Sequence, residues 1–134
     1  MINYKVGTIP ETEQICTVYD SSGINRPTAD KSRIKEMYVN SDLIVSAWDG
    51  EKLVGIDRTI TDGCYCAYLS DLAVKKENPH LGIGKELVEI TRKELGEKVT
   101  LILLSAPSAV DYYPKIGFEK SEVCFLIHRK KVNE

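Results

Sequence analysis

A short segment, Gly82-Ile83-Gly84-Lys85, stands where an apolar strand pattern ending at Val74 leads through a polar loop into an amphipathic helix pattern. The first backbone N–H groups of a helix have no acceptor inside the helix, and the helix dipole places partial positive charge beside them. Glycine leaves out the Cβ that would hold an anion away from these groups, and Lys85 adds a point charge. The segment therefore predicts a phosphate site, with a tight strand-to-helix connection as the alternative.

Two other phosphate-binding motifs do not fit this segment. The dinucleotide-binding motif needs a third glycine at position 87, where Leu87 stands, and a turn directly after the strand instead of a seven-residue loop. The P-loop needs Ser or Thr after Lys85, where Glu86 stands, and a glycine five residues before Gly84. Both motifs are therefore rejected.

A second segment with chemical potential reads Tyr-Tyr-Pro-Lys-Ile-Gly-Phe at positions 112–118. Together, the stretch from Val74 to Gly84 and the Tyr-x-x-x-Gly-Phe pattern that begins at Tyr113 resemble the Gcn5-related N-acetyltransferase (GNAT) superfamily. Its members move an acetyl group from acetyl-CoA to an amine. The resemblance implies acetyl-CoA as co-substrate, a primary amine of a small molecule as acceptor, and direct attack in a ternary complex. It places the cofactor on Leu72, Ala73, Val74, Leu81, Gly82, Ile83, Gly84 and Lys85.

The chemistry of acetyl transfer accounts for these residue types. An amine is mostly protonated at neutral pH and must lose a proton before it attacks the thioester carbonyl. Attack forms an oxyanion, which a backbone N–H at or near Leu72 is expected to stabilise, while the amide-rich pantetheine arm pairs with residues 72–74 like an added strand. By the resemblance, Tyr113 is the catalytic residue that protonates the leaving sulfur; the alternative is a tyrosine that only packs on the sheet. Tyr112 is expected in core or cofactor packing.

The sequence identifies no general base. Relatives often use a carboxylate on the fourth strand, at positions where this chain has Tyr68 and Ser70. In a regular strand Asp71 points away from the face that Ser70 and Leu72 share, which leaves a water relay or an acceptor that arrives deprotonated. The side chains expected to contact the acceptor are Asp57, Arg58 and Asp62; the alternative is that these three lie on a solvent-exposed face without a binding role. By analogy with the family, the loop 21–26 is a second candidate for the acceptor site.

Three positions depart from the family pattern. Pro79 replaces an Arg or Gln in the loop, His80 replaces a glycine, and Ala106 replaces an Asn. Proline has no N–H to donate to a phosphate. With the missing strand carboxylate, these departures keep open a hypothesis of another class, a non-catalytic coenzyme A or acyl-CoA-binding sensor or interaction module.

The elements that must position these residues follow from the periodicity of the chain. Thr8 and Glu11 form a capping-box pattern with Pro10 in the first turn, and Asp49-Gly50 marks a hairpin. The stretch 99–104 is almost continuously apolar, as a central strand covered on both faces is, and one helix joins it to the strand ending at Val74 in a parallel βαβ crossover.

The prediction is a single GNAT-like α+β domain, 1–134, with a mixed, mostly antiparallel sheet of about six or seven strands and about four helices. Strands are expected at 2–6, 43–48, 53–60, 64–74, 99–104, 117–118 and 123–128, and helices from the capping box to 19, from 29 to 39, from the glycine pair to 96, and from 107 to 113.

Composition limits the class of protein and its partners. The 134 residues carry a net charge of −2, which argues against a general nucleic-acid binder. No apolar run of about 18 residues and no basic-then-apolar N-terminus occur, so a cytoplasmic protein without a membrane partner is expected. Relatives often form homodimers, and a homodimer stays open. The spacing of Cys16, Cys64, Cys66 and Cys124 matches no zinc-binding pattern, so no metal site is expected. The four cysteines are expected to be reduced and mostly buried.

Overall fold

The computed structural model describes residues 1–78 and 81–130. Backbone contacts divide the chain into two compact units, Met1–Leu104 and Ser105–Glu134, and each is described by itself. Pro79 and His80, where the sequence departs from the family loop pattern, lie outside the described residues.

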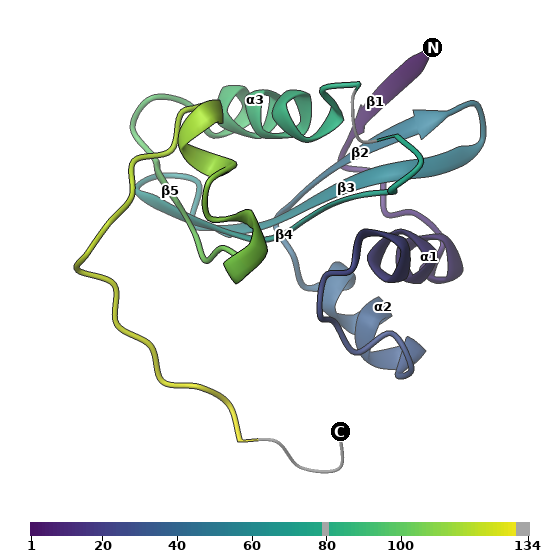
Figure 1. Cartoon of the computed structure of the whole chain (residues 1–134), viewed down its shortest axis with the longest axis horizontal. Coiled ribbons are helices and arrows are strands. Elements are labelled where there is room, and N and C mark those ends of the chain that lie inside the picture. Colours follow the sequence, from purple (N-terminus) through teal and green to yellow (C-terminus); the bar gives the residue numbers. More distant parts are fainter. Residues whose placement is uncertain (79–80, 131–134) are drawn as a thin grey trace. The chain divides into compact units, whose positions relative to one another are not determined.

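A five-stranded sheet forms the centre of the first unit (Figure 1). Its strands lie in chain order: β1 to β4 pair antiparallel in succession, and β5 runs parallel to β4, which confirms the predicted mostly antiparallel sheet and βαβ crossover. The predicted hairpin at Asp49-Gly50 is also present, with Gly50 at a positive φ of 62°. The strands are β1 (Ile2–Val6), β2 (Leu43–Asp49), β3 (Lys52–Thr61), β4 (Cys66–Val74) and β5 (Thr100–Leu103).

Three α-helices accompany the sheet: α1 (Thr12–Ser22), α2 (Lys31–Val39) and α3 (Ile83–Leu95). The capping-box prediction is wrong, because the N-cap of α1 is Glu11 and no side chain caps it. The N–H of Gly7 still donates to the Ile44 carbonyl at 2.8 Å, which holds the chain beside β2 beyond the end of β1. Helix α2 is capped as sequence rules require, with the Asp30 side chain accepting from the Arg33 N–H at 3.1 Å.

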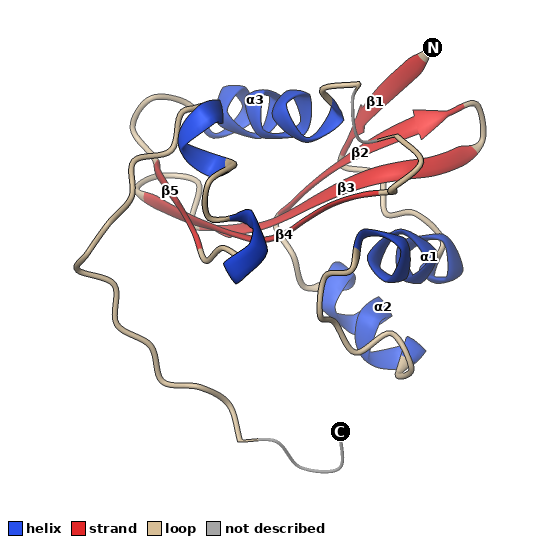
Figure 2. Cartoon of the chain, in the orientation of Figure 1, coloured by secondary structure: helices blue, strands red, loops and turns tan. Residues whose placement is uncertain are grey.

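The helices cover opposite faces of the sheet (Figure 2). On one face, α1 and α2 bury an apolar cluster that includes Tyr19, Ile34 and Tyr38. On the other face, α3 buries Ile83 and Leu87 against β2 and β3. The side chains of residues 53–59 in β3 are therefore buried on both faces of the sheet, whereas β4 buries only alternate side chains, from Ala67 to Ala73.

The position of β5 differs from the prediction. Among the described residues it pairs with β4 alone, and its four side chains alternate between exposed and half-buried, with Ile102 49% exposed. The expectation of a central strand covered on both faces is therefore wrong. An apolar run records burial of some kind, but it does not say whether a further strand pairs with the outer edge.

The second unit contains two 3₁₀ helices, Pro107–Ala109 and Tyr113–Ile116, in place of the expected helix 107–113. Residues 117–130 form no strand in the described structure, so the strands expected at 117–118 and 123–128 are wrong here. The described residues of the first unit supply five strands and three α-helices, fewer than the sequence predicted. A segment with high strand propensity forms a strand only where it can pair with the edge of another strand and pack its side chains. The side chains of Phe125 and Ile127 are 91% and 102% exposed, so this packing is missing.

In the described residues, no helix has the length and apolar character needed to cross a bilayer.

Candidate active site

A β-bulge interrupts β4 at Ser70. In the pairing of β3 with β4, Arg58 lies opposite Asp71 and Thr59 lies opposite Leu69, which leaves Ser70 as the extra residue. The pairing of β4 with β5 ends at the same place, with Leu69 opposite Leu103. In the described part of the chain, residues 70–74 of β4 therefore have an edge that β5 does not cover.

The open edge presents backbone N–H groups in the stretch expected to hold the pantetheine arm. The N–H of Lys75 points to β3, where it donates to the Val54 carbonyl at 2.8 Å. Because the N–H groups of successive strand residues alternate in direction, those of Leu72 and Val74 point to the open side, and that of Ala73 points to β3. The edge can therefore pair with an extended, amide-containing ligand through Leu72 and Val74.

The start of α3, where an anion site is expected, has backbone N–H groups that precede the first intrahelical hydrogen bond. Gly82 is the N-cap, at a φ of +66°, and no side chain caps the helix. The first intrahelical bond runs from the Glu86 N–H to the Gly82 carbonyl at 3.0 Å, so the N–H groups of residues 83–85 precede it. A Cβ at Gly82 would meet open space, so the positive φ, not crowding, is what favours glycine there.

The expected cofactor residues on α3 do not all present their side chains. Leu81 is 61% exposed, and Lys85 is also exposed. Ile83 is 2% exposed and packs in the core beneath α3, so only its backbone can reach a ligand. Gly55 allows this packing, because a Cβ there would lie 2.9 Å from Ile83 Cγ2 and 3.2 Å from Leu87 Cδ1. Sequence reasoning missed Gly55, although a glycine inside a strand often marks such a close approach.

Asp71 is the centre of a buried polar network on the face covered by α1 and α2. Its side chain is fully buried and accepts from Arg26 Nε and Arg58 Nε, each at 2.5 Å, and from the Tyr19 hydroxyl at 2.7 Å. The Tyr19 and Tyr38 hydroxyls are 2.5 Å apart, which extends the network into the core. The bulge makes the strand irregular, so the predicted separation of Asp71 from Ser70 is wrong: the hydroxyl of Ser70 lies 3.3 Å from Asp71 Oδ1.

This network keeps Asp71 ionised. Burial by itself raises the pKa of the Asp71 carboxyl, but the hydrogen bond and charge of Arg58, the charge of Arg26 and the hydrogen bond from Tyr19 outweigh it, so the pKa lies below its usual range. A carboxylate held by two guanidinium groups is a poor proton acceptor. Asp71 therefore does not supply the missing general base.

The three candidates for an acceptor wall go to different places. Asp57 is fully buried on the side of the sheet that α3 covers, where its carboxyl accepts hydrogen bonds from Thr91 at 2.7 Å and from Thr59 at 2.8 Å. Asp57 therefore neither contacts an acceptor nor lies on a solvated face, and both expectations are wrong for it. Burial raises the pKa of Asp57 to about 7, against the hydrogen bonds of Thr91 and Thr59. Arg58 is buried on the opposite face, and Asp62 is exposed, where it accepts from the N–H groups of a tight turn.

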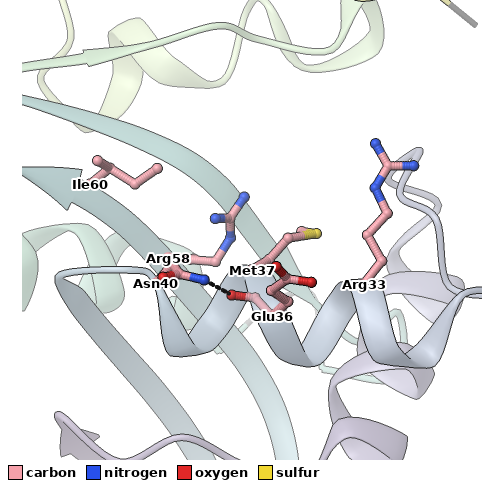
Figure 3. A pocket seen from close by; sticks show the side chains of 6 residues that line it. All are labelled: Arg33, Glu36, Met37, Asn40, Arg58 and Ile60. Carbon is pink, nitrogen blue, oxygen red and sulfur yellow. Dashed lines mark hydrogen bonds between the residues drawn. The ribbon is translucent and has the colours of Figure 1, made fainter.

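A shallow cavity of about 390 Å³, largely open to solvent, lies between α2 and β3 (Figure 3). Figure 3 shows the guanidinium of Arg58 near Met37, while Arg33 extends from α2 some distance away. The volume is within the range of small-molecule sites. Of the residues that line this cavity, the sequence analysis singled out only Arg58, because the others belong to no recognisable motif. The cavity is lined by Arg33, Glu36, Met37, Asn40, Arg58 and Ile60.

In the second unit, Tyr113 lies at the start of a 3₁₀ helix within an aromatic group. Its ring centroid is 5.3 Å from that of Tyr112 and 5.6 Å from that of Phe118, both edge-on. Its carbonyl accepts from the Phe118 N–H at 3.1 Å, and Gly117 takes a φ of +105°. Gly117 and Phe118 thus shape the turn around Tyr113, while its catalytic role stays a prediction.

The cysteines are free, as expected, but the expectation that most are buried is wrong. Cys16 is buried, while Cys64, Cys66 and Cys124 are exposed. Within residues 1–78 and 81–130, no group of three or more His, Cys, Asp or Glu side chains is arranged to hold a metal ion.

Sequence comparison supplies the family of this fold. The family described as "Acetyltransferase (GNAT) domain" matches residues 15–126. An "Uncharacterized N-acetyltransferase ycf52" from Pyropia yezoensis is 32% identical over 117 residues, which is 82% of this chain and 64% of that protein. The chain therefore spans less than two thirds of the length of this relative. With the family match extending over most of its residues, the chain belongs to the GNAT acetyltransferase domain family.

Solved structures show the same fold. A crystal structure from meticillin-resistant Staphylococcus aureus, described as a protein of unknown function and "Probable Acetyltransferase", has a TM-score of 0.84 at 24% identity, over 98% of this chain and 100% of that chain. The aminoglycoside N-acetyltransferase AAC(6')-Iy in complex with CoA has a TM-score of 0.72 at 14% identity, over 98% and 96% of the two chains. These likenesses confirm the predicted GNAT-like α+β class.

Proposed function

We propose that the chain transfers an acetyl group from acetyl-CoA to a primary amine of a small molecule, by direct attack in a ternary complex, with 1–134 acting as one domain. The observation that carries the proposal is the open edge of β4 beyond Leu69, which precedes the uncapped start of α3 in a GNAT fold. The pantetheine amides would pair with Leu72 and Val74, and the diphosphate would bind the N–H groups of residues 83–85, with Lys85 adding charge.

The chemical step follows from this placement of the cofactor. The amine nitrogen attacks the thioester carbon, and the carbonyl oxygen becomes an oxyanion that the Leu72 N–H stabilises. The C–S bond then breaks as Tyr113 gives its proton to the thiolate, and the Tyr113 phenolate is reprotonated from solvent. The attacking nitrogen, which is positively charged after the attack, loses a proton to water, so that the neutral amide forms. Water takes this role because Asp71, a carboxylate on β4, is committed to Arg26 and Arg58.

The cavity between α2 and β3 supports a small acceptor. Its wall combines the charges of Arg33, Arg58 and Glu36 with the apolar side chains of Met37 and Ile60, which suits a polar molecule of modest size. A structural neighbour with the same fold is an aminoglycoside acetyltransferase, which adds support for an amine. The proposal includes a cytoplasmic location and no nucleic-acid or membrane partner, consistent with the net charge of −2.

Two observations favour a second candidate, a coenzyme A-binding sensor or interaction module. The buried Asp71 cannot act as a base, and the family Asn position holds Ala106, whose carbonyl is already bonded to the Ala109 N–H at 2.9 Å. A protein with the cofactor site but without proton-transfer groups would bind acetyl-CoA and not turn it over.

Thiol release from acetyl-CoA against a panel of amines, together with calorimetry of coenzyme A binding, separates the two candidates. Turnover with at least one amine is expected, and Tyr113→Phe should lower kcat by about 10- to 100-fold while changing the Kd for coenzyme A less than threefold. Tyr112→Phe, on the neighbouring ring, is the matched control and should keep most of the turnover. Binding without turnover on any amine would favour the sensor, and no binding at millimolar coenzyme A would end both.

A further inference from the structure

Arg26, on the loop between α1 and α2, reaches the point where the open edge of β4 begins. Its Nε donates to Asp71 Oδ1 at 2.5 Å, and its Nη2 donates to the Ser70 carbonyl at 2.7 Å. Its Nη1 donates to the carbonyl of Asn25 at 2.7 Å, which ties the guanidinium to its own loop. One side chain thus holds both residues of the bulge from a loop more than 40 positions earlier in the sequence.

The Ser70 carbonyl is the backbone acceptor on the open edge next to the Leu72 N–H. It belongs to the same peptide as the Asp71 N–H, and the two groups point in opposite directions. Alternation back from Lys75, whose N–H points to β3, puts the Asp71 N–H on the β3 side, so the Ser70 carbonyl faces the open side. An uncapped carbonyl there would place negative partial charge beside the oxyanion of the proposed reaction. The guanidinium of Arg26 caps it with positive charge.

The charges of the network do not cancel. Two guanidinium groups, Arg26 and Arg58, share the carboxylate of Asp71, while the phenols of Tyr19 and Tyr38 are neutral because burial, the largest cause, raises the pKa of each above its ordinary value. The side chain of Arg26 is 24% exposed and that of Arg58 is 8% exposed, so the excess charge is more accessible at Arg26. Positive charge at this place stabilises an oxyanion and lowers the pKa of a nearby ammonium group.

We propose that Arg26 is a positioning residue for the transfer reaction: by holding the Ser70 carbonyl and Asp71, it fixes the bulge and aims the Leu72 N–H at the reacting carbonyl, and its charge promotes deprotonation of the acceptor amine. This inference rests on the proposed function. It explains how the acceptor amine can lose its proton although Asp71, the carboxylate on β4, is bonded to Arg26 and Arg58 and cannot act as the base.

Arg26→Lys and Arg26→Gln test the two parts separately, because lysine keeps the charge but cannot donate to Asp71 and Ser70 through a planar fork. Both variants should lower kcat about 10- to 100-fold, with the KM for acetyl-CoA within threefold of wild type. In Arg26→Gln alone, the rise of kcat/KM with pH should shift upward by about one pH unit. Free guanidinium ion at millimolar concentration should restore part of the kcat of Arg26→Ala, and urea should not.

Lys31→Gln, which removes an exposed ion pair with Glu13, is the control and should match wild type. Wild-type kcat in Arg26→Lys and an unshifted pH profile in Arg26→Gln would overturn the inference. If the wild type turned over no amine, the proposed function would fail first. The backbone ¹H–¹⁵N resonance of Leu72 in Arg26→Lys would then decide the positioning role: a shift absent from Lys31→Gln supports it, and an unmoved resonance refutes it.

Discussion

Stability between pH 5 and pH 8 should be governed by one buried carboxyl, Asp57. Burial raises its pKa to about 7 in the folded chain, from an ordinary value of 3.8, while hydrogen bonds from Thr91 and Thr59 oppose the rise. Between these two values the folded state keeps a proton that the unfolded state has lost. The free energy of unfolding therefore falls as the pH rises through this window and levels off above pH 7.

The hydroxyl of Thr91 lies between two acceptors. The Thr91 hydroxyl lies 2.7 Å from Asp57 Oδ2 and 2.9 Å from the Leu87 carbonyl, but it has a single hydrogen. An ionised Asp57 would leave two acceptors competing for that hydrogen. Protonation of Asp57 would reverse the bond that it accepts from Thr91 in the ionised form, so that Thr91 donates to Leu87 alone, and the amide of an asparagine can donate to Thr91 in the same way.

The size of the effect follows from the two pKa values. Between pH 5 and pH 8 the wild type should lose about 2.5 kcal/mol of unfolding free energy, or roughly 8 °C in Tm for a domain of this length. Asp57→Asn should remove this slope and be more stable than the wild type at pH 8. Thermal unfolding followed by circular dichroism at four pH values measures both, with Asp49→Asn, an exposed acid at the end of β2, as the control that keeps the slope.

Other groups with shifted pKa values titrate outside this window. The pKa of Asp71 is lowered, so its stabilising contribution is present above its unfolded value of 3.8 and is lost only as the pH falls below that. The pKa values of Tyr19 and Tyr38 are raised from 10.0, which puts their titration in strong alkali. A wild-type Tm that stays constant from pH 5 to pH 8, or an Asp57→Asn variant with the wild-type slope, would refute the reasoning.

Three further substitutions test the packing and the site. Gly55→Ala puts a Cβ 2.9 Å from Ile83 Cγ2 and should cost about 1–3 kcal/mol in urea unfolding; an unchanged midpoint would mean that α3 shifts freely. Tyr19→Phe removes a buried donor to Asp71 and should cost about 1–3 kcal/mol by the same assay, a loss that an unaltered unfolding curve would contradict. Gly82→Glu adds a negative charge where α3 begins and should abolish coenzyme A binding in calorimetry, while Gly50→Glu, also at a positive φ, should retain it; equal affinities would place the anion site elsewhere.

The local elements could be predicted from the sequence because their signals lie within a few residues of one another. The turn at Asp49-Gly50 and the flanking strand patterns define the β2–β3 hairpin. The apolar spacing from Ile83 and the glycine at 96 define α3 and its end. The same local signals failed at Thr8, because the Gly7 N–H still pairs with the Ile44 carbonyl beside β2 and α1 begins only at Thr12.

What the sequence by itself determined was the class of fold, the start of α3 and the strand that leads to it, since periodicity and glycine placement are properties of short segments. Tertiary structure alone decided the edge position of β5, the bulge at Ser70 and the covering of both faces of β3, which buries Asp57 and Arg58. It also joined Arg26 to Asp71 across 45 positions. The physical reason is that a charged side chain or a strand edge takes its properties from its partners, and those partners come from distant segments that no local pattern specifies.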